Sequence, residues 1–268
     1  MPLIYLYLIT VPVIIILIYL YVRDKFNKEP IWLLLLTFLG GCLSVLPVLF
    51  VGRFTELLLP YFQGIAGPLY SAFFRAGFVE EFFKFVVVLL IVWWSKHFDE
   101  KFDGIIYSVY VSMGFALVEN FLYVTGYGFG TGVLRFFTAV PAHGIFAIAM
   151  GYYIGLAKFT PNRKVLYLIM AFVSAWLIHG VYDAIIMVGY NWLLLAFIPF
   201  LILMYIFGFR RINRLAKLKV DPRTLVQNPE VYPESPLDIV ETHAEMPDEG
   251  INFDRDQPDR FERNGTKE

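Results

Sequence analysis

Nine ionisable side chains fall inside long apolar stretches of this sequence. They are Arg75, Glu80, Glu81, Lys84, Glu119, Arg135, His143, His179 and Asp183. Because an ionisable group inside a lipid bilayer is energetically expensive, such residues mark a functional site by default. A glutamate can take a proton from water and return it to a leaving amine, and an imidazole can hydrogen-bond the oxyanion of a tetrahedral intermediate. The set therefore favours hydrolysis by an activated water molecule.

Two other kinds of hydrolytic site are weaker interpretations. The single cysteine, Cys42, lies in a different apolar stretch without ionisable neighbours, so a Cys-His pair is not indicated. A catalytic zinc ion is the competing version, because His143, His179 and Glu80 would supply a His₂Glu ligand set. The sequence has no HExxH motif. Glutamate chemistry without a metal is preferred, no cofactor is expected, and zinc stays an alternative.

The spacing of these residues predicts which of them share a helix face. Glu80 and Lys84 are four residues apart, so Lys84 is expected to act as a charge partner of the glutamates. Glu81 points about 100° away from Glu80, which suggests that the two acids divide their roles. His179 and Asp183 are also four residues apart and share a face.

The elements that must position these residues are membrane-spanning helices. A helix needs about 20 apolar residues to cross the hydrocarbon core. Seven segments qualify: Pro2–Val22, Ile31–Val51, Pro68–Trp94, Gly104–Tyr127, Thr131–Ala157, Val165–Val188 and Trp192–Phe209. The stretch Phe54–Gly67 is too short to span, and Pro60 interrupts it, so it is interpreted as an interfacial or re-entrant element.

The charges between these segments predict their orientation. The connections expected in the cytoplasm carry 13 Lys and Arg residues, whereas the outer connections carry only Arg53. By the positive-inside rule, the N-terminus faces out and the C-terminus faces in. The predicted fold is an all-α, polytopic bundle of about seven transmembrane helices.

Helix rise then places the polar residues at similar depths. With about 1.5 Å per residue, Glu80 and His143 lie roughly 18 Å below the outer boundary. Glu119 and His179 lie at about 12 and 14 Å, and Asp183 at about 8 Å. Four successive helices are thus expected to form one buried polar site in the outer half of the membrane.

Composition divides the chain into two parts. Of 268 residues, 58% are apolar and 17% are charged. Residues 1–220 hold 17 basic and 10 acidic residues, whereas residues 221–268 hold 5 and 13, with six prolines. A transmembrane domain over 1–220 and an acidic, disordered cytoplasmic tail over 221–268 are expected. Nucleic acid is excluded as a partner, because no basic groove is available outside the membrane flanks.

Several polar and small residues have structural interpretations. Arg75 and Arg135 have long side chains that could reach the interface by snorkelling. Asn120 could bridge helices. Gly151 and Gly155 give a small-residue face for close helix packing.

Four motifs in order resemble those of PrsW-type intramembrane proteases. FVEEFFKF, with Glu80, Glu81 and Lys84, resembles the first motif, EExxK. GFALVENFLY, with Glu119 and Asn120, resembles the second. RFFTAVPAHGIFAIAMGYYIG resembles the third through His143, and HGVYD resembles the last through His179 and Asp183. The resemblance covers roughly Pro68–Val188. It implies membership of the wider superfamily of CAAX-prenyl endopeptidases and bacteriocin-processing membrane proteins, and a multi-pass protein of the bacterial inner membrane.

This resemblance implies a substrate and roles for the site residues. PrsW-type proteins cut a single-span anti-sigma factor near the outer membrane face, so the expected partners are such a substrate and the lipid bilayer. Glu80 or Glu81, with Glu80 preferred, would activate water. Glu119 and His143 would position that water or the scissile carbonyl. His179 would stabilise the oxyanion, and Asp183 would orient His179. Lys84 and Asn120 would support the site.

Two functions without proteolysis stay open at this point. A non-catalytic scaffold or receptor could use the polar layer to fix helix packing. An ion-coupled transporter could use it as a proton relay.

Overall fold

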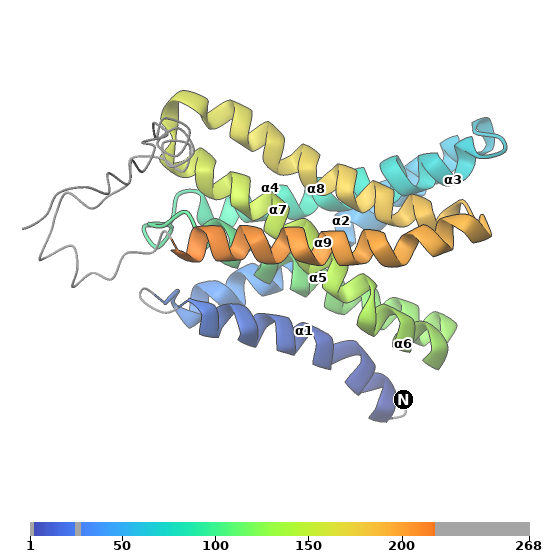
Figure 1. Ribbon diagram of the computed structural model, residues 1–268, viewed down its shortest axis with the longest axis horizontal. Coiled ribbons are helices and arrows are strands. Elements are labelled where there is room, and N and C mark those ends of the chain that lie inside the picture. Colours follow the sequence, from blue (N-terminus) through green and yellow to red (C-terminus); the bar gives the residue numbers. More distant parts are fainter. Residues whose placement is uncertain (1–2, 25–27, 218–268) are drawn as a thin grey trace, which may run out of the picture. The chain divides into compact units, whose positions relative to one another are not determined.

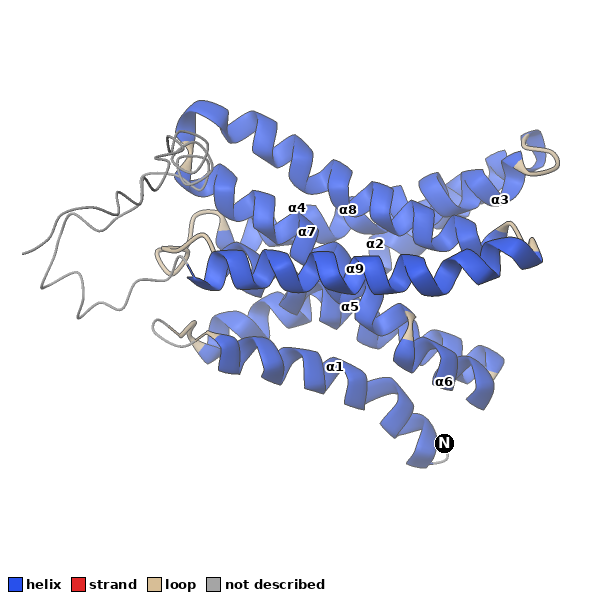
Figure 2. Cartoon of the chain, in the orientation of Figure 1, coloured by secondary structure: helices blue, strands red, loops and turns tan. Residues whose placement is uncertain are grey.

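A computed structural model of the chain describes residues 3–24 and 28–217 (Figure 1). Within these ranges the regular structure is helical and contains no strand, which confirms the predicted all-α class (Figure 2). The acidic tail expected over 221–268 lies outside the described residues, so that division of the chain remains an expectation.

Nine α-helices and three short 3₁₀ or π segments make up the described residues. In chain order they are α1 (Leu3–Arg23), α2 (Ile31–Leu58), η1 (Leu59–Tyr61), α3 (Ala66–Tyr70), η2 (Ser71–Phe78), α4 (Val79–Val92), α5 (Asp103–Tyr127), α6 (Phe129–Phe137), α7 (Ala139–Phe159), η3 (Pro161–Arg163), α8 (Lys164–Met187) and α9 (Asn191–Lys217).

These elements correspond to the seven predicted spans. Six helical stretches of the described chain, 21 to 31 residues long, are apolar enough to cross a membrane. The remaining predicted span is built by α3, η2 and α4, which follow one another without a break. This stretch is less apolar because it carries Arg75 and the Glu80, Glu81 and Lys84 group. The polytopic membrane bundle is therefore confirmed.

The second span differs from its prediction. The helix does not end at Val51 but continues to Leu58, and η1 then covers part of the segment expected to be interfacial. Residues 52–58 contain no proline, so nothing in the backbone ends the helix before Pro60, which lacks an N–H for the ladder. Gly64 then reverses the chain with a positive φ of 56°.

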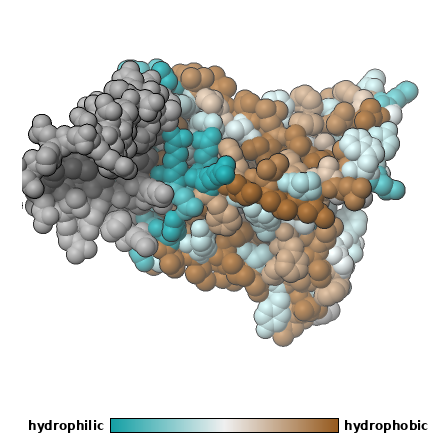
Figure 3. Space-filling model, viewed as in Figure 1, coloured by the Kyte–Doolittle hydropathy of each residue, from teal (hydrophilic) through white to brown (hydrophobic). Residues whose placement is uncertain are grey.

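The two ends of the bundle differ in charge, as expected for a membrane protein. The connections α1–α2, α4–α5 and α7–α8 and the end of α9 share the left end in Figure 2, opposite the first residues of α1. These are the connections that carry the basic residues. Hydrophobic residues cover the middle of the helices, and hydrophilic residues gather towards that left end (Figure 3).

The core of the bundle is formed by α5 and α7. Within their most apolar windows, 72% of the α5 residues and 61% of the α6–α7 residues are buried, compared with 12% for α9. The two helices touch through backbone: a Cβ added at Gly104 would lie 2.5 Å from the Gly151 carbonyl oxygen. The small-residue face predicted at Gly151 thus packs α7 against α5.

Two irregular segments flank the polar residues. The π-helix η2 comes directly before α4, and π-helical turns occur frequently at functional sites. A backbone carbonyl of this segment, that of Phe73, accepts a hydrogen bond of 2.6 Å from the Trp176 indole of α8. The second break separates α6 from α7 at Thr138, one turn before His143.

Candidate active site

The predicted polar residues of four helices meet inside the bundle. Glu80, Glu81 and Lys84 come from α4, and Glu119 comes from α5. His143 comes from α7, and His179 and Asp183 come from α8. Within the set formed by Glu80, Glu81, His143 and His179, possible ligand atoms lie within 4.8 Å of one another. The convergence expected from helix depth is therefore present.

The Lys84 ammonium group is the centre of this set. It lies 2.8 Å from the Oε1 of Glu81, 3.4 Å from the Oε2 of Glu80 and 3.1 Å from the Nδ1 of His143. It also lies 4.0 Å from the centre of the Phe115 ring, a cation–π contact. Its side chain is only 1% exposed. Lys84 thus compensates the charge of both glutamates and links α4 to α7.

The contacts of His143 define which of its nitrogens carries the proton. An ammonium group can only donate, so the Nδ1 of His143 accepts from Lys84. In the neutral ring the proton is then on Nε2, which donates to the Oε2 of Glu119 at 2.8 Å. This chain of hydrogen bonds fixes the orientation of the imidazole.

His179 lies between carboxylates on both sides of its ring. Its Nδ1 is 2.9 Å from the Oε1 of Glu81. Its Nε2 is 3.4 Å from the Oδ2 of Asp183 and 4.0 Å from the Oε2 of Glu80. Both ring nitrogens can therefore donate to an acid, and the predicted contact between His179 and Asp183 is present.

Arg135 is a residue whose part in this site the sequence interpretation missed. It does not snorkel: its Nη2 donates to the Oε2 of Glu119 at 2.6 Å, and its Nε donates to the Oδ1 of Asn120 at 3.1 Å. Its guanidinium also lies 4.0 Å from the centre of the Tyr123 ring. In the sequence, the one indication that Arg135 lies near the site was its position two helical turns before His143.

Asn120 bridges helices and does not line the cavity. Its Nδ2 donates to the backbone carbonyl of Leu8 in α1 at 3.0 Å, while its Oδ1 accepts from Arg135. Arg75 makes a different contact, an ion pair of 3.3 Å with Glu56 at the end of α2.

The two adjacent glutamates differ in access to solvent. The Glu81 side chain is fully buried, whereas that of Glu80 is 11% exposed. Glu80 lines a cavity of about 50 Å³ together with Glu119, His143, His179 and Asp183. It also lines a larger cavity of about 330 Å³ between α2, η2 and α5. The smaller cavity has room for more than one water molecule beside Glu80.

Comparisons with known proteins identify the family of this chain. The family model described as PrsW family intramembrane metalloprotease matches residues 29–209. The chain belongs to the PrsW family.

Three curated relatives illustrate the similarity, each called Protease PrsW. The protein from Oceanobacillus iheyensis is 36% identical over 195 residues, which cover 73% of this chain and 88% of the relative. That from Geobacillus kaustophilus is 37% identical over 172 residues, 64% of this chain and 75% of the relative. That from Bacillus subtilis is 33% identical over 195 residues, which cover 72% of this chain and 87% of the relative. No solved structure matches the chain.

Membership of the PrsW family and the membrane helices make this a multi-pass bacterial membrane protein of a protease family.

The word metalloprotease in the family description raises the question of whether the site fits a metal. By type, two histidines and two glutamates could hold zinc. In this arrangement, however, Glu80, Glu81 and His143 already face the Lys84 ammonium, within 3.4 Å. A divalent ion among them would lie beside that positive charge, so these residues do not fit a metal in this arrangement.

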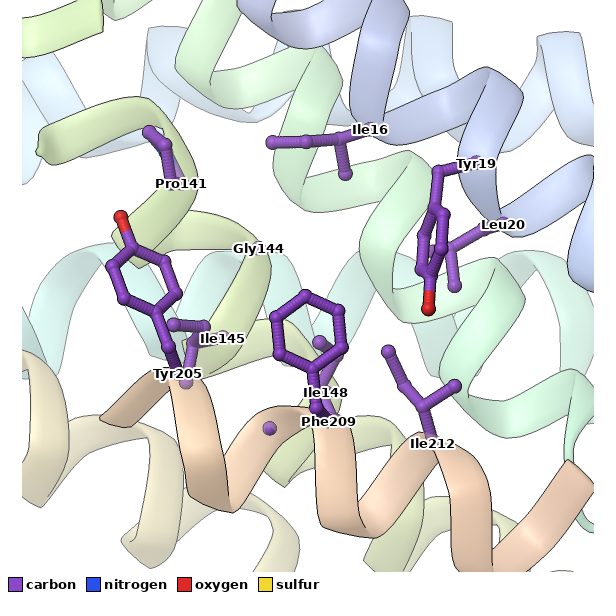
Figure 4. A pocket seen from close by; sticks show the side chains of 11 residues that line it. Ile16, Tyr19, Leu20, Pro141, Gly144, Ile145, Ile148, Tyr205, Phe209 and Ile212 are labelled. Carbon is purple, nitrogen blue, oxygen red and sulfur yellow. The ribbon is translucent and has the colours of Figure 1, made fainter. Parts of the chain in front are cut away.

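A separate hollow in this PrsW-family chain has no comparable chemistry. It is a cavity of about 100 Å³ between α1, α7 and α9 (Figure 4). Its walls are aliphatic and aromatic, with Ile16 and Tyr19 from α1, Gly144 from α7 and Tyr205 from α9. No acid, lysine, arginine or histidine lines it. The polar site is thus separate from this apolar hollow.

Proposed function

We propose that the chain is an intramembrane endopeptidase in which Glu80 activates water to hydrolyse a peptide bond of a single-span membrane protein. The observation that carries the proposal is the difference between the two adjacent glutamates. Glu80 lines both cavities, whereas Glu81 is enclosed by Lys84 and His179. A general base must reach the water that it activates, and Glu80 is the acid of this pair that does so.

Each remaining residue then has a role that its contacts support. Glu81 holds the Lys84 ammonium and the Nδ1 of His179 in place. The Nε2 of His179 lies 4.0 Å from Glu80 and lines the same cavity, so it is placed to donate to the oxyanion that forms there. Asp183 lies 3.4 Å from the same Nε2 and helps to orient this imidazole at the edge of the cavity.

Glu119 and His143 form the second wall of the reaction site. Both line the cavity with Glu80, and the hydrogen bond between them is 2.8 Å long. Arg135 donates to the same oxygen of Glu119, Oε2, and is therefore a positioning residue. Glu119 and His143 position the water or the scissile carbonyl in front of Glu80.

The substrate class follows from the resemblance and from the place of the site. The site lies on the outer-facing halves of α4, α5, α7 and α8, as their sequence positions and the positive-inside rule indicate. A cut there falls near the outer membrane face of a single-span protein, and an anti-sigma factor is the expected example. Membership in a protease family favours hydrolysis over the scaffold and transporter alternatives.

The test is proteolysis by the purified full-length protein in liposomes. A panel of single-span bacterial membrane proteins, including anti-sigma factors, is incubated with the wild type and with Glu80→Gln. We expect the wild type to cut a panel member and Glu80→Gln to be slower by about a hundredfold or more, with unchanged folding. The exposed-residue variant Lys96→Gln should cut at the wild-type rate.

Treatment with a chelator distinguishes catalysis by glutamate from catalysis by a metal ion. Dialysis against a strong chelator, with metal content measured by mass spectrometry, should leave the rate unchanged. Full activity of Glu80→Gln, or loss of wild-type activity on chelation with recovery by zinc, would contradict the glutamate mechanism. Absence of cleavage across the panel under all conditions would contradict the proposed substrate class.

A further inference from the structure

The larger cavity forms a groove that leads from the outer end of the bundle to Glu80. It lies between the C-terminal half of α2, the π-helix η2 and α5. At its inner end it shares Glu80, Glu119 and Tyr123 with the small reaction cavity. Next to Gly52, in the α2 wall, an added Cβ would meet no atom within 4 Å. The α2 wall of the groove is therefore unobstructed at Gly52.

Another hollow continues this groove outwards. It has a volume of about 530 Å³ and shares Ser71, Arg75 and Met187 with the groove. Its other walls come from η1 and the turn at Gly64, at the outer end of the chain's second and third spans. A continuous path therefore runs from the outer turn, past Arg75, to the water-activating glutamate.

Charged residues stand at the outer part of this path. Arg53 and Glu56 belong to the last turns of α2, and Arg75 belongs to η2. Arg75 pairs with Glu56 at 3.3 Å, but the two side chains are 37% and 58% exposed, so the pair is weak. Arg53 is exposed and forms no ion pair with any residue in the described ranges. Two positive groups thus face one negative group.

Resting on the proposed function, we propose that Arg53 and Arg75 bind an acidic side chain of the substrate, on the outer side of its scissile bond. Arg75 precedes Glu80 by five residues, or about 7 Å along a helix. An extended chain advances about 3.3 Å per residue. The acidic residue would therefore lie about two to four residues from the bond that is cut.

The same geometry assigns Glu56 the role of an internal competitor. Its carboxylate occupies Arg75 when no substrate is bound, and the substrate carboxylate replaces it. Because both contacts are half-exposed ion pairs, each contributes a modest factor in affinity and weakens with salt. Arg53 and Arg75 thus select substrates with an acidic outer segment, while Glu80 and its neighbours perform the reaction.

Binding can be measured apart from turnover. The full-length Glu80→Gln protein in phosphatidylcholine nanodiscs is titrated with a fluorescent single-span peptide. This peptide has a segment of four residues outside its membrane helix, and three of the four are Asp. The matched peptide carries Asn in their place. We expect the Asp peptide to bind about threefold more tightly at low salt. Arg53→Gln or Arg75→Gln in the same background should remove this preference, and 0.5 M salt should reduce it.

Three further variants show whether charge at this place is responsible. Arg75→Lys keeps the charge and should keep the preference for Asp. Glu56→Gln removes the competitor and should strengthen binding of the Asp peptide about twofold to threefold. Arg163→Gln changes an exposed arginine in η3, at the other end of the bundle, and should bind both peptides as the parent does.

The outcomes distinguish this inference from its alternatives. Equal binding of the Asp and Asn peptides by the parent would overturn it. So would an arginine dependence that appears only in phosphatidylglycerol discs, because the arginines would then bind lipid phosphate. Cleavage of a panel substrate at equal rates with Asp or Asn in its outer segment would overturn the inference but keep the proposed protease. A preserved Asp preference without any proteolysis would contradict the protease instead.

Discussion

The ammonium group of Lys84 lies 2.8 Å from the Oε1 of Glu81, and neither side chain is more than 1% exposed. Removing one member of such a buried pair leaves an uncompensated charge in the interior, which is strongly destabilising. Because His179 also hydrogen-bonds Glu81, this pair supports both sides of the candidate active site.

Lys84→Met should therefore lower the free energy of unfolding by about 3 to 5 kcal/mol. The double variant Glu81→Gln/Lys84→Met removes both charges of this pair but leaves that of Glu80, so it should recover part of this loss while proteolysis stays abolished. Thermal unfolding in detergent, followed by tryptophan fluorescence, measures stability. Lys96→Met, at an exposed lysine, should stay within about 0.5 kcal/mol of the wild type. A double variant no more stable than Lys84→Met would contradict charge compensation.

Arg135 offers a test of positioning, because it touches Glu119 and not the proposed water-activating Glu80. Arg135→Lys keeps the charge but loses the second hydrogen bond, to Asn120, so kcat should fall by about tenfold. Arg135→Gln should lower kcat by about a hundredfold. In both variants KM should change little, since the substrate groove is intact. Arg163→Lys is the matched control, and a change confined to KM would refute positioning through Glu119.

The sequence predicted the helical fold and the shared depth of the polar residues well, for physical reasons. Long apolar segments and the asymmetry of basic loops define the spans, and a constant rise per residue places Glu80 and His143 at similar depths. The rotation of each helix about its axis depends on tertiary packing. For this reason the contact between Lys84 and His143, and the turn of Arg135 towards Glu119, were not predictable from spacing.

The predicted end of the second span was wrong for a related reason. Hydropathy falls after Val51, but helical hydrogen bonding does not require an apolar sequence, and α2 continues to Leu58. The two extra turns place Arg53 and Glu56 beside the groove. A sequence interpretation that ended the helix early could not bring these residues next to Arg75.

The contact between α5 and α7 gives a third prediction. Gly151→Ala would place a Cβ against the backbone of Gly104 and Ile105, which cannot move aside as a flexible side chain does. We expect a loss of about 2 to 3 kcal/mol and a displaced His143, because overpacking a tight core costs this much. In Gly126→Ala, in α5, the added Cβ meets no atom within 4 Å. That variant should be neutral or slightly more stable, and two equally destabilised variants would contradict the packing argument.

The last prediction concerns Glu29, in the connection between α1 and α2, where it accepts a hydrogen bond from the Tyr107 hydroxyl. Burial raises the pKa of this carboxyl from 4.5 to about 7; the charges of Asp24 and Asp99 act in the same direction, and hydrogen bonds from Tyr107 and Asp103 oppose the shift. The folded protein thus binds this proton more tightly than the unfolded chain. Its contribution to stability is full below pH 4.5 and disappears as the pH rises through about 7.

Wild-type stability should therefore decline between pH 5 and pH 8 by on the order of 2 kcal/mol from this residue. Glu29→Gln cannot ionise but keeps an acceptor for Tyr107, so its stability should change less over this range and exceed that of the wild type at pH 8. Unfolding temperatures in detergent across the pH series provide the measurement. Glu56→Gln, at an exposed glutamate near the other end of α2, should keep the wild-type slope. A Glu29→Gln protein with that same slope would show that Glu29 does not control the pH dependence.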